Sequence, residues 1–560
     1  MAPTNEGGQV SEAHGGVTTT PTWTIMLYLS GDNNLSTEMV RALKDIDDQG
    51  VPDGVDMTIL YDALSRCCPT FLYDLSGRRG TPTRAHRIER PEAAPIPLSQ
   101  GNVYAWGEDS SSPEALREFI DWSLAGPQAQ YRMVILSGHG SGALGDFLPD
   151  NNASGGQAGS LTIPALRTAL EDEQVALQRA HLLQAEEKLV HVLGMDSCLM
   201  SMAEVCNEIH DSVRYVVGSE GFIPNAGWPY GHLLKMLRQR NVRTLTPQAL
   251  TGHLVEDFLA YYRDYLPADV SVDIAGCDLD LLGGLTEAVR QLVDVLDARD
   301  RQVQNLVLLA HWRAQSYKFE QYTDLWDFCH QLRTEAEASR MRLEWVAGAS
   351  EPPKTCESRD RLEQLGAERQ TLERIEHACQ RVETAINAMM GHRHDGKGGR
   401  QGYQGIEFQH SHGLSVYFPW SQTAFAEEYK ELTFARGSGW GRFLSNYVEA
   451  TRRRCRCEEE GDVHPELRWP AESQIAAMMP SLASAPTGTR NAPNVSKNAP
   501  NVSKNAPNVS KNAPLVSKLL GVVGETLPWS MKNPPRSVCL SDGHGVKRPP
   551  AAYTGAAVKP

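Results

Sequence analysis

The chain has 560 residues, of which 41% are hydrophobic, and this is enough for a sizeable core and two to four domains. Its 54 Lys and Arg residues against 69 Asp and Glu residues give a net charge of −15, and without a basic cluster nucleic acid is not expected as a partner. No apolar run is long enough to cross a membrane and the first residues do not resemble a secretory leader, so a cytoplasmic protein is expected.

The predicted elements begin after a short tail. Residues 1–22 are rich in Gly, Thr and Pro and are predicted to be disordered. The apolar run Trp23–Leu29 is too short for an amphipathic helix and predicts a buried parallel strand. A helix follows, with Ser36 as its N-cap and Gly50 as its end.

Strands and helices then alternate as far as residue 221. Strands are predicted at 55–64, 70–75, 131–142, 188–198 and 213–221, and helices from Ser112 or Pro113, over 164–184 and over 199–210. The polar segment 76–113 is predicted to be a loop. This alternation predicts a parallel sheet covered by helices on both faces, with ligands at the carboxyl ends of the strands.

The second half of the chain is predicted to be more helical and to end in a low-complexity tail. Residues 244–350 are mostly helical, 357–390 form a charged amphipathic helix and 405–419 return to strand. NAPNVSK repeats within 491–518, and a Pro in every repeat excludes a coiled coil despite the period of seven. The resulting division is a tail (1–22), an α/β core (23–240), a C-terminal part of the folded region (241–455) and a repeat-bearing tail (456–560).

Residues that can carry chemistry stand at the ends of predicted strands. His139 and Cys198 each follow an apolar run directly. If these two strands are neighbours in a parallel sheet, an imidazole base lies within reach of a thiol, and a helix starting after Cys198 would favour the thiolate. A buried structural cysteine and a structural histidine in a glycine turn fit the same pattern. The residues alone leave the two interpretations even.

Several sequence blocks resemble the clostripain family of cysteine peptidases, in the caspase–legumain–gingipain clan. The blocks are IMLYLSGDNNL, VILSGHGSG and GMDSCLMSMAEV, and YVVGSEGFIPNAGWPY, QYTDLWDFC, GLSVYFPW and ELTFARGSGWGRFL extend the resemblance over about 23–450. It implies a caspase-like three-layer α/β/α sandwich with a mostly parallel sheet, helical additions and a disordered C-terminal tail. It also implies that 23–240 is the catalytic core of a Cys/His peptidase.

The resemblance implies roles for individual residues. His139 matches the catalytic histidine and Cys198 the nucleophile, which forms the acyl-enzyme. The backbone N–H groups of Gly140 and Cys198 would hold the oxyanion. Asp196 would line the primary specificity pocket, or else accept backbone hydrogen bonds at the end of its strand.

The segment after the first strand has two interpretations. By resemblance to legumain-like relatives, Asp32, Asn33 or Asn34 would orient His139. The alternative is that these polar side chains cap the following helix.

The expected specificity pocket departs from the family pattern. Members that cleave after Arg or Lys resemble SEE…PGDGW, whereas this chain has GSEGFIPNAGW, with Asn225 and Ala226 where the acid would stand. A buried cation needs a paired carboxylate. Cleavage after a basic residue would then depend on Asp196 or Glu220.

Self-cleavage is a further expectation from the family. Relatives are processed between the histidine and the cysteine strands. Here the segment 143–187 offers Arg167 and Arg179 as candidate sites.

No cofactor is predicted and no metal site is identified. Four histidines, at 392, 394, 410 and 412, could chelate Zn²⁺ or Ni²⁺, but exposed loop histidines are the simpler account. The pairs Cys67–Cys68 and Cys455–Cys457 lack a second pair at zinc-ribbon spacing. Calcium is implied only by analogy with the family, because no EF-hand pattern is present.

The sequence therefore predicts a cysteine endopeptidase acting on protein or peptide substrates, with its oligomeric state open. One alternative is a catalytically silent caspase-like scaffold that binds partners. Another is a redox sensor that pairs Cys198 with Cys206, although these sulfurs are expected to be too far apart for a bridge.

Overall fold

The computed structural model describes residues 20–64, 69–87, 99–107, 110–152, 158–296, 300–317, 321–349, 356–391, 399–421 and 424–459, all within one structural unit. Nearly all of the predicted N-terminal tail and the repeat-bearing tail from residue 460 onward lie outside the described residues, as do Cys67–Cys68, His392 and His394. The side chains of Cys455 and Cys457 also lie outside what the structure describes.

The central sheet is parallel in its middle and antiparallel at both sides. The parallel strands lie in the order β10 (Val213–Gly218), β9 (Val190–Asp196), β6 (Tyr131–Ser137), β1 (Trp23–Gly31) and β2 (Val55–Ala63). Beside β10 lie β11 (Val272–Asp278) and β14 (Gln401–Gln404), and beside β2 lie β3 (Thr70–Asp74), β5 (Asn102–Trp106) and β4 (Ala85–Arg87). The predicted mostly parallel sheet is confirmed.

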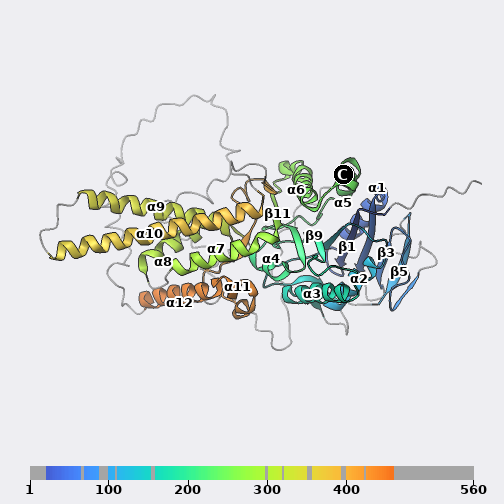
Figure 1. Ribbon diagram of the computed structural model, residues 1–560, viewed down its shortest axis with the longest axis horizontal. Coiled ribbons are helices and arrows are strands. Elements are labelled where there is room, and N and C mark those ends of the chain that lie inside the picture. Colours follow the sequence, from blue (N-terminus) through green and yellow to red (C-terminus); the bar gives the residue numbers. More distant parts are fainter. Residues whose placement is uncertain are drawn as a thin grey trace, which may run out of the picture. The chain divides into compact units, whose positions relative to one another are not determined.

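Helices cover both faces of the sheet, which confirms the predicted three layers (Figure 1). One face is covered by α2 (Pro113–Leu124), α3 (Ile163–Arg179) and α4 (Ala203–Ile209), and the other by α1 (Ser36–Gln49), α5 (Tyr230–Gln239) and α6 (Pro247–Arg263). Alternate residues of β1 feed the two cores: Met26 and Tyr28 point into the first, Ile25 and Leu27 into the second. Strands buried on both faces produce the continuous apolar runs seen in the sequence.

The loop expected for residues 76–113 is wrong, because β4 and β5 lie inside it. β5 pairs antiparallel with β3 and buries Tyr104, whose ring meets Trp122 of α2 edge-on at 5.9 Å. β5, which lies between β3 and the edge strand β4, gains its stability from this pairing and packing rather than from a local pattern.

Helix α1 starts at Ser36 itself, one residue earlier than an N-cap at Ser36 predicts. Ser36 is its first helical residue, and Leu35 occupies the N-cap position without a side-chain cap. The side chain of Asn33 accepts a hydrogen bond from the Leu35 N–H at 2.9 Å and supports the turn instead. Gly50 ends the helix as predicted, with a φ of 68°.

The region 241–455 shares the central sheet with the region before it, since it supplies β11 and β14. The helix predicted at 357–390 is confirmed, whereas only the end of the strand predicted at 405–419 is a strand. The remaining elements are β7 (Phe147–Asp150), β8 (Gly159–Leu161), α7 (Leu282–Val295), α8 (Arg301–Arg313), β12 (Ser316–Tyr317), β13 (Tyr322–Asp324), α9 (Leu325–Ala349), α10 (Cys356–Met389), β15 (Ser415–Tyr417), α11 (Thr433–Gly437) and α12 (Trp440–Glu459).

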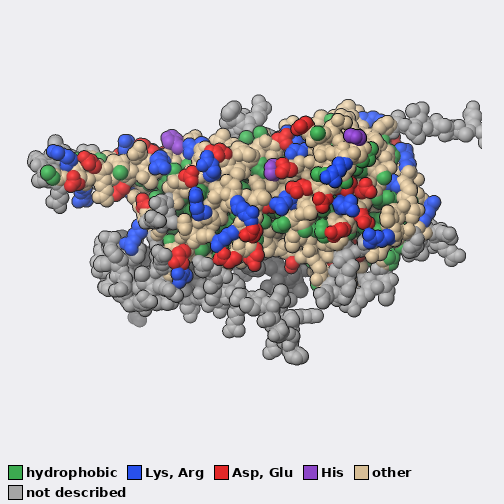
Figure 2. Space-filling view, turned by 60° about the horizontal axis from the view of Figure 1, so that its bottom comes forward, with side chains coloured by type: hydrophobic (Ala, Val, Ile, Leu, Met, Phe, Trp, Pro, Cys, Tyr) green, Lys and Arg blue, Asp and Glu red, His purple; other side chains and the backbone are tan. Residues whose placement is uncertain are grey.

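Two surface properties bear on partners. On the face drawn in Figure 2, acidic and basic side chains are interspersed rather than gathered by sign. Among the helices that the structure describes, none is both long and apolar enough to cross a membrane.

Candidate active site

The ends of β6 and β9 bring His139 and Cys198 together. The two strands are parallel neighbours, with Ser137 opposite Asp196. Each chain then runs two residues further, so that His139 and Cys198 leave the sheet at the same level and line the same cleft. His139 and Cys198 therefore lie at the same edge of one sheet, as the sequence predicts, and that they act as a catalytic pair stays a prediction.

Asn34 fixes the orientation and the tautomer of His139. Its side-chain oxygen Oδ1 lies 2.6 Å from Nε2 of His139. An amide oxygen can only accept a hydrogen bond, so Nε2 carries the proton and Nδ1 keeps a free lone pair. Burial lowers the pKa of His139, which leaves the ring neutral and able to act as a base near pH 7.

The other two residues of this segment hold the loop rather than the histidine. The side chain of Asn33 donates to the carbonyl oxygens of Ser30 and Pro149 at 3.1 and 3.0 Å. Asp32 accepts from Nδ2 of Asn152 at 2.8 Å. Of the three residues proposed to orient the imidazole, Asn34 is therefore the one in contact with it.

The sulfur of Cys198 lies against the backbone of Ile223. The Ile223 N–H donates to Sγ at 3.2 Å, and the Ile223 carbonyl oxygen lies 3.6 Å from Sγ. Burial raises the pKa of the Cys198 thiol to about 11, and the nearby carboxylates of Asp196 and Asp273 act in the same direction. The thiol is therefore protonated at neutral pH and has to lose its proton during attack.

The helix start expected at Cys198 is wrong. Helix α4 begins only at Ala203, and Leu199, with a φ of 65°, turns the chain away from β9. The Leu199 N–H donates to the Gly221 carbonyl oxygen at 3.0 Å. This long-range contact, which a local helical pattern cannot reveal, overrides the helix propensity of the segment.

Gly140 sits where only a glycine fits. A Cβ at this position would lie 2.5 Å from the carbonyl oxygen of Cys198. Within the described residues, no hydrogen bond to another residue uses the N–H of Gly140 or that of Cys198. Both donors are thus available to a substrate oxygen, as an oxyanion hole requires.

A pocket beside Cys198 has Asp196 at its base. This carboxylate is 5% exposed and accepts from Ser137 Oγ and Tyr230 OH at 2.7 Å each and from the Trp228 N–H at 2.9 Å. Burial raises its pKa to about 6. Asp196 therefore lines the pocket and also anchors the backbone, so the two roles considered for it coexist.

The other predicted pocket residues divide into two groups. Asn225 and Ala226 line the pocket and are exposed, and neither carries a charge. Glu220 does not line it: its side chain is fully buried and accepts from the Gly413 N–H at 2.6 Å. The structure thus contradicts a substrate contact by Glu220, because backbone groups far along the chain enclose it. Glu38 of α1 does line the pocket, and no sequence pattern singles it out.

Glu220 belongs to a cluster of buried carboxyl groups behind the cleft, together with Asp273 and Asp324. Asp273 accepts from the N–H groups of Glu220 and Gly221 at 2.7 and 2.9 Å. Burial raises the pKa of Asp273 to about 7, and burial together with the charges of Asp324 and Asp273 raises the pKa of Glu220 well above its usual range. The cluster fixes the segment that contacts the Cys198 sulfur.

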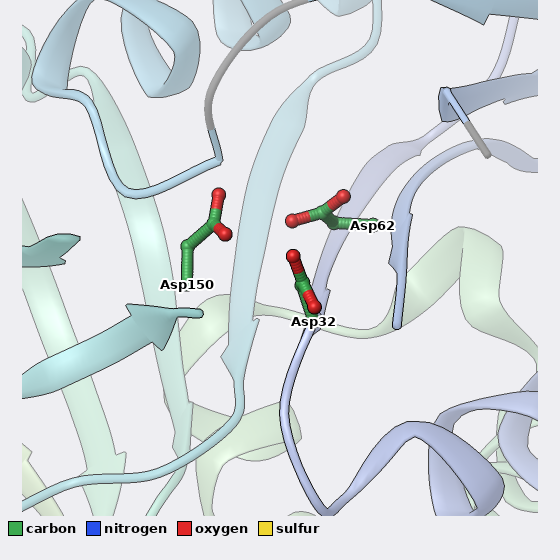
Figure 3. Close-up of side chains that lie close together, drawn as sticks. All are labelled: Asp32, Asp62 and Asp150. Atoms are coloured by element: carbon green, nitrogen blue, oxygen red, sulfur yellow. The ribbon is translucent and has the colours of Figure 1, made fainter. Parts of the chain in front are cut away.

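A second acidic group includes Asp32, which directly follows the last residue of β1. Asp32, Asp62 and Asp150 are each buried, and one oxygen from each lies within 4.8 Å of the others. Figure 3 shows the three carboxylates pointing toward one another from different segments. Oxygen ligands of this kind suit Ca²⁺ or Mg²⁺. Among the described residues this is the group whose geometry could hold an ion, and its scattered sequence positions explain why no pattern revealed it.

Among the described residues, the other candidate ligands and thiols do not form the predicted clusters. His412 stacks on Trp326 at 3.9 Å, with Nδ1 3.6 Å from Asp324, and His410 is exposed. Cys206 is fully buried in α4 next to Cys277. The redox pairing of Cys198 with Cys206 is therefore wrong.

The two arginines considered for self-cleavage both lie in helix α3. Arg167 lies near its N-terminal end, where it forms an ion pair with Glu208, and Arg179 is its last residue. A peptidase needs its substrate in an extended form, so a helical segment is a poor cleavage site unless it unfolds first.

Comparison with known proteins gives one family. The model of the clostripain family, Peptidase C11, matches residues 27–447. Clostripain from Hathewaya histolytica is 25% identical over 218 residues. That match covers 36% of this chain and 37% of clostripain, so the chain spans little more than a third of the length of that relative.

Solved structures with a similar fold include two bacterial C11 proteases. A secreted C11 cysteine protease from Bacteroides thetaiotaomicron, in complex with an irreversible peptide inhibitor, has a TM-score of 0.48 and 15% identity. An inactive zymogen C11 protease from Parabacteroides distasonis has a TM-score of 0.45 and 18% identity. Each match covers 75% of this chain and 99% of the other.

Proposed function

The chain belongs to the clostripain family of cysteine peptidases, and on this premise we propose that it is an endopeptidase that cleaves peptide bonds with His139 and Cys198. The observation that carries the proposal is the register of β6 and β9, which delivers both side chains to one cleft. A silent scaffold would have no need for a neutral histidine held in one tautomer opposite a thiol.

The first chemical step forms an acyl-enzyme. Nδ1 of His139 takes the thiol proton as the Cys198 sulfur attacks the substrate carbonyl carbon. Both groups are neutral at rest, so charge develops only as the reaction proceeds. The N–H groups of Gly140 and Cys198 then hold the oxyanion, while the hydrogen bond from Ile223 supports the sulfur.

Collapse of the tetrahedral intermediate breaks the peptide bond. The imidazolium of His139 gives its proton to the leaving amine and returns to the neutral form, which leaves a thioester on Cys198. Water then enters, and His139 removes a proton from it during attack on the thioester. The second tetrahedral intermediate then collapses: the bond between the carbonyl carbon and sulfur breaks, the acid leaves, and the imidazolium of His139 returns its proton to the Cys198 sulfur, so the atoms and charges balance over the cycle.

The residue before the scissile bond is proposed to be basic. Its side chain enters the pocket beside Cys198, where Asp196 lies at the base. A carboxylate in a partly closed pocket attracts a cation and repels an acid.

The proposal is tested with internally quenched peptides whose two ends are blocked. The wild type is expected to cut within the peptide, and Cys198→Ala and His139→Ala are expected to lose the activity. Cys356→Ala removes an exposed thiol on α10 and serves as the control. Persistent cleavage by Cys198→Ala, or a wild type that cleaves no peptide, would overturn the proposal and favour a scaffold.

A further inference from the structure

The pocket beside Cys198 holds a second carboxylate, which comes from a different element. Asp196 ends β9, and Glu38 stands in the first turn of α1. Both line the pocket, and no Lys or Arg is among the residues that line it. Two acids that line one pocket create a negative potential where a substrate side chain would enter.

Asp196 is poorly placed to hold a cation alone. Three neutral donors already occupy its two oxygens. Gly227 also covers it so closely that a Cβ there would come within 2.9 Å of Oδ2. Its pKa of about 6 means that it carries only part of its charge in mildly acidic solution.

Glu38 has the opposite properties. Its side chain is 29% exposed, and it forms an ion pair with Arg41, which is 69% exposed, at 3.4 Å. An exposed ion pair of this type contributes little to stability. Glu38 can therefore leave Arg41 for an incoming cation at small cost.

The segment 223–227, which also lines the pocket, cannot provide a negative charge. Its residues Asn225 and Ala226 are exposed and uncharged. Family members that cleave after basic residues resemble a pattern with an acid at the place of Ala226. In this chain, a carboxylate from α1, that of Glu38, lines the same pocket.

We infer that Glu38 is a specificity-determining residue, which binds the cationic end of an Arg or Lys side chain that precedes the scissile bond. Asp196 supports the same cation from the base of the pocket. The inference rests on the proposed peptidase function. It also means that Glu38, which comes from a different part of the sequence, takes over the role of the acid that is missing from the segment 223–227.

The test compares Glu38→Gln with the wild type on two peptides that differ at one residue. One peptide has Arg before the scissile bond and the other has citrulline, which has nearly the same shape without the charge. For Glu38→Gln, kcat/KM is expected to fall about tenfold on the Arg peptide, mainly through KM, and to stay within about twofold on the citrulline peptide.

The matched control is Asp45→Asn. Asp45 is an exposed acid further along the same helix and does not line the pocket, so both peptides should be cleaved as by the wild type. A second variant moves the acid to the segment 223–227: Glu38→Gln combined with Ala226→Asp is expected to recover the preference for Arg.

Two results would contradict the inference in different ways. If Glu38→Gln leaves the ratio of the two kcat/KM values unchanged, Glu38 does not recognise the charge of the substrate side chain, although the peptidase function stands. If the wild type cleaves neither these peptides nor any other, the peptidase function fails and this inference fails with it.

Discussion

The cleft above β6 and β9 and the carboxyl cluster behind it both contain ionisable groups, but the two regions hold them differently. In the cleft, His139 and Cys198 are partly exposed, and each keeps one position open for a reacting partner. In the cluster, Glu220, Asp273 and Asp324 are closed to solvent and accept hydrogen bonds from backbone N–H groups. The first arrangement suits chemistry and the second suits rigidity.

The two regions are connected through one segment of backbone. Asp273 holds the N–H groups of Glu220 and Gly221, the Gly221 carbonyl oxygen receives the Leu199 N–H, and the Ile223 N–H reaches the Cys198 sulfur. Changes in the cleft should therefore alter rates with little effect on stability. Changes in the cluster should alter stability first.

The largest effect is expected from Gly140→Ala. The added methyl group would meet the Cys198 carbonyl oxygen at 2.5 Å and displace an oxyanion donor. We expect kcat/KM to fall by on the order of 10²-fold or more. In Gly284→Ala, the new Cβ has no atom within 4 Å and provides the control. Wild-type rates in Gly140→Ala would show that the backbone there takes no part.

A smaller loss of rate is expected from Asn34→Ala. Without Oδ1 at 2.6 Å, the imidazole of His139 loses the partner that fixes its tautomer. We expect kcat to fall by about 10-fold to 100-fold while KM changes little. Asn34→Asp keeps an acceptor at the same place and should recover most of the rate. Equal losses in both variants would contradict an orienting role.

The buried carboxyl cluster is expected to make the free energy of unfolding depend on pH. The pKa of Asp273 is raised to about 7 in the folded protein, so the folded state binds its proton more tightly than the unfolded state does. The resulting stabilisation is complete below about pH 4 and is lost as the pH rises to about 7.

Asp273→Asn removes this contribution. Between about pH 4 and pH 7, the free energy of unfolding of the wild type should fall by on the order of 2 kcal/mol relative to that of the variant. Urea unfolding at several pH values measures it, with the exposed Asp48→Asn as the control. A difference that stays constant with pH would contradict the raised pKa.

The smallest expected effect concerns Asp196. Because its pKa is raised to about 6, this carboxylate is charged above that pH and becomes neutral below it. We expect the KM for an Arg peptide to rise about threefold, relative to a citrulline peptide, as the pH falls from about 7.5 to 5. If KM changes with pH in the same way for both peptides, Asp196 only stabilises the local structure and does not bind the substrate side chain.

Much of the cleft can be predicted from the sequence because its groups stand at the ends of strands. The apolar runs before His139 and Cys198 mark parallel strands, and such strands present their carboxyl ends at one edge. Asn34 follows the same rule. The resemblance to the clostripain family then favours a catalytic pair over structural residues.

The remaining features depend on contacts between distant residues. Glu220 accepts from Gly413, which lies 193 positions away, and nothing near Glu220 in the sequence indicates this. The turn at Leu199 has a helical pattern but is held open by Gly221. In the sequence, Glu38 looks like an ordinary exposed acid of an amphipathic helix, and only the folded structure shows that it lines the pocket. Tertiary packing decides each of these cases.

Covalent labelling tests most directly whether His139 and Cys198 act as a pair. The protein is treated with a peptidyl acyloxymethyl ketone that carries Arg next to the reactive group, and the modified residue is located by mass spectrometry. We expect a single label on Cys198, no label in Cys198→Ala, and labelling at least about 10²-fold slower in His139→Ala. A label on another residue, or an unchanged rate in His139→Ala, would contradict the pairing.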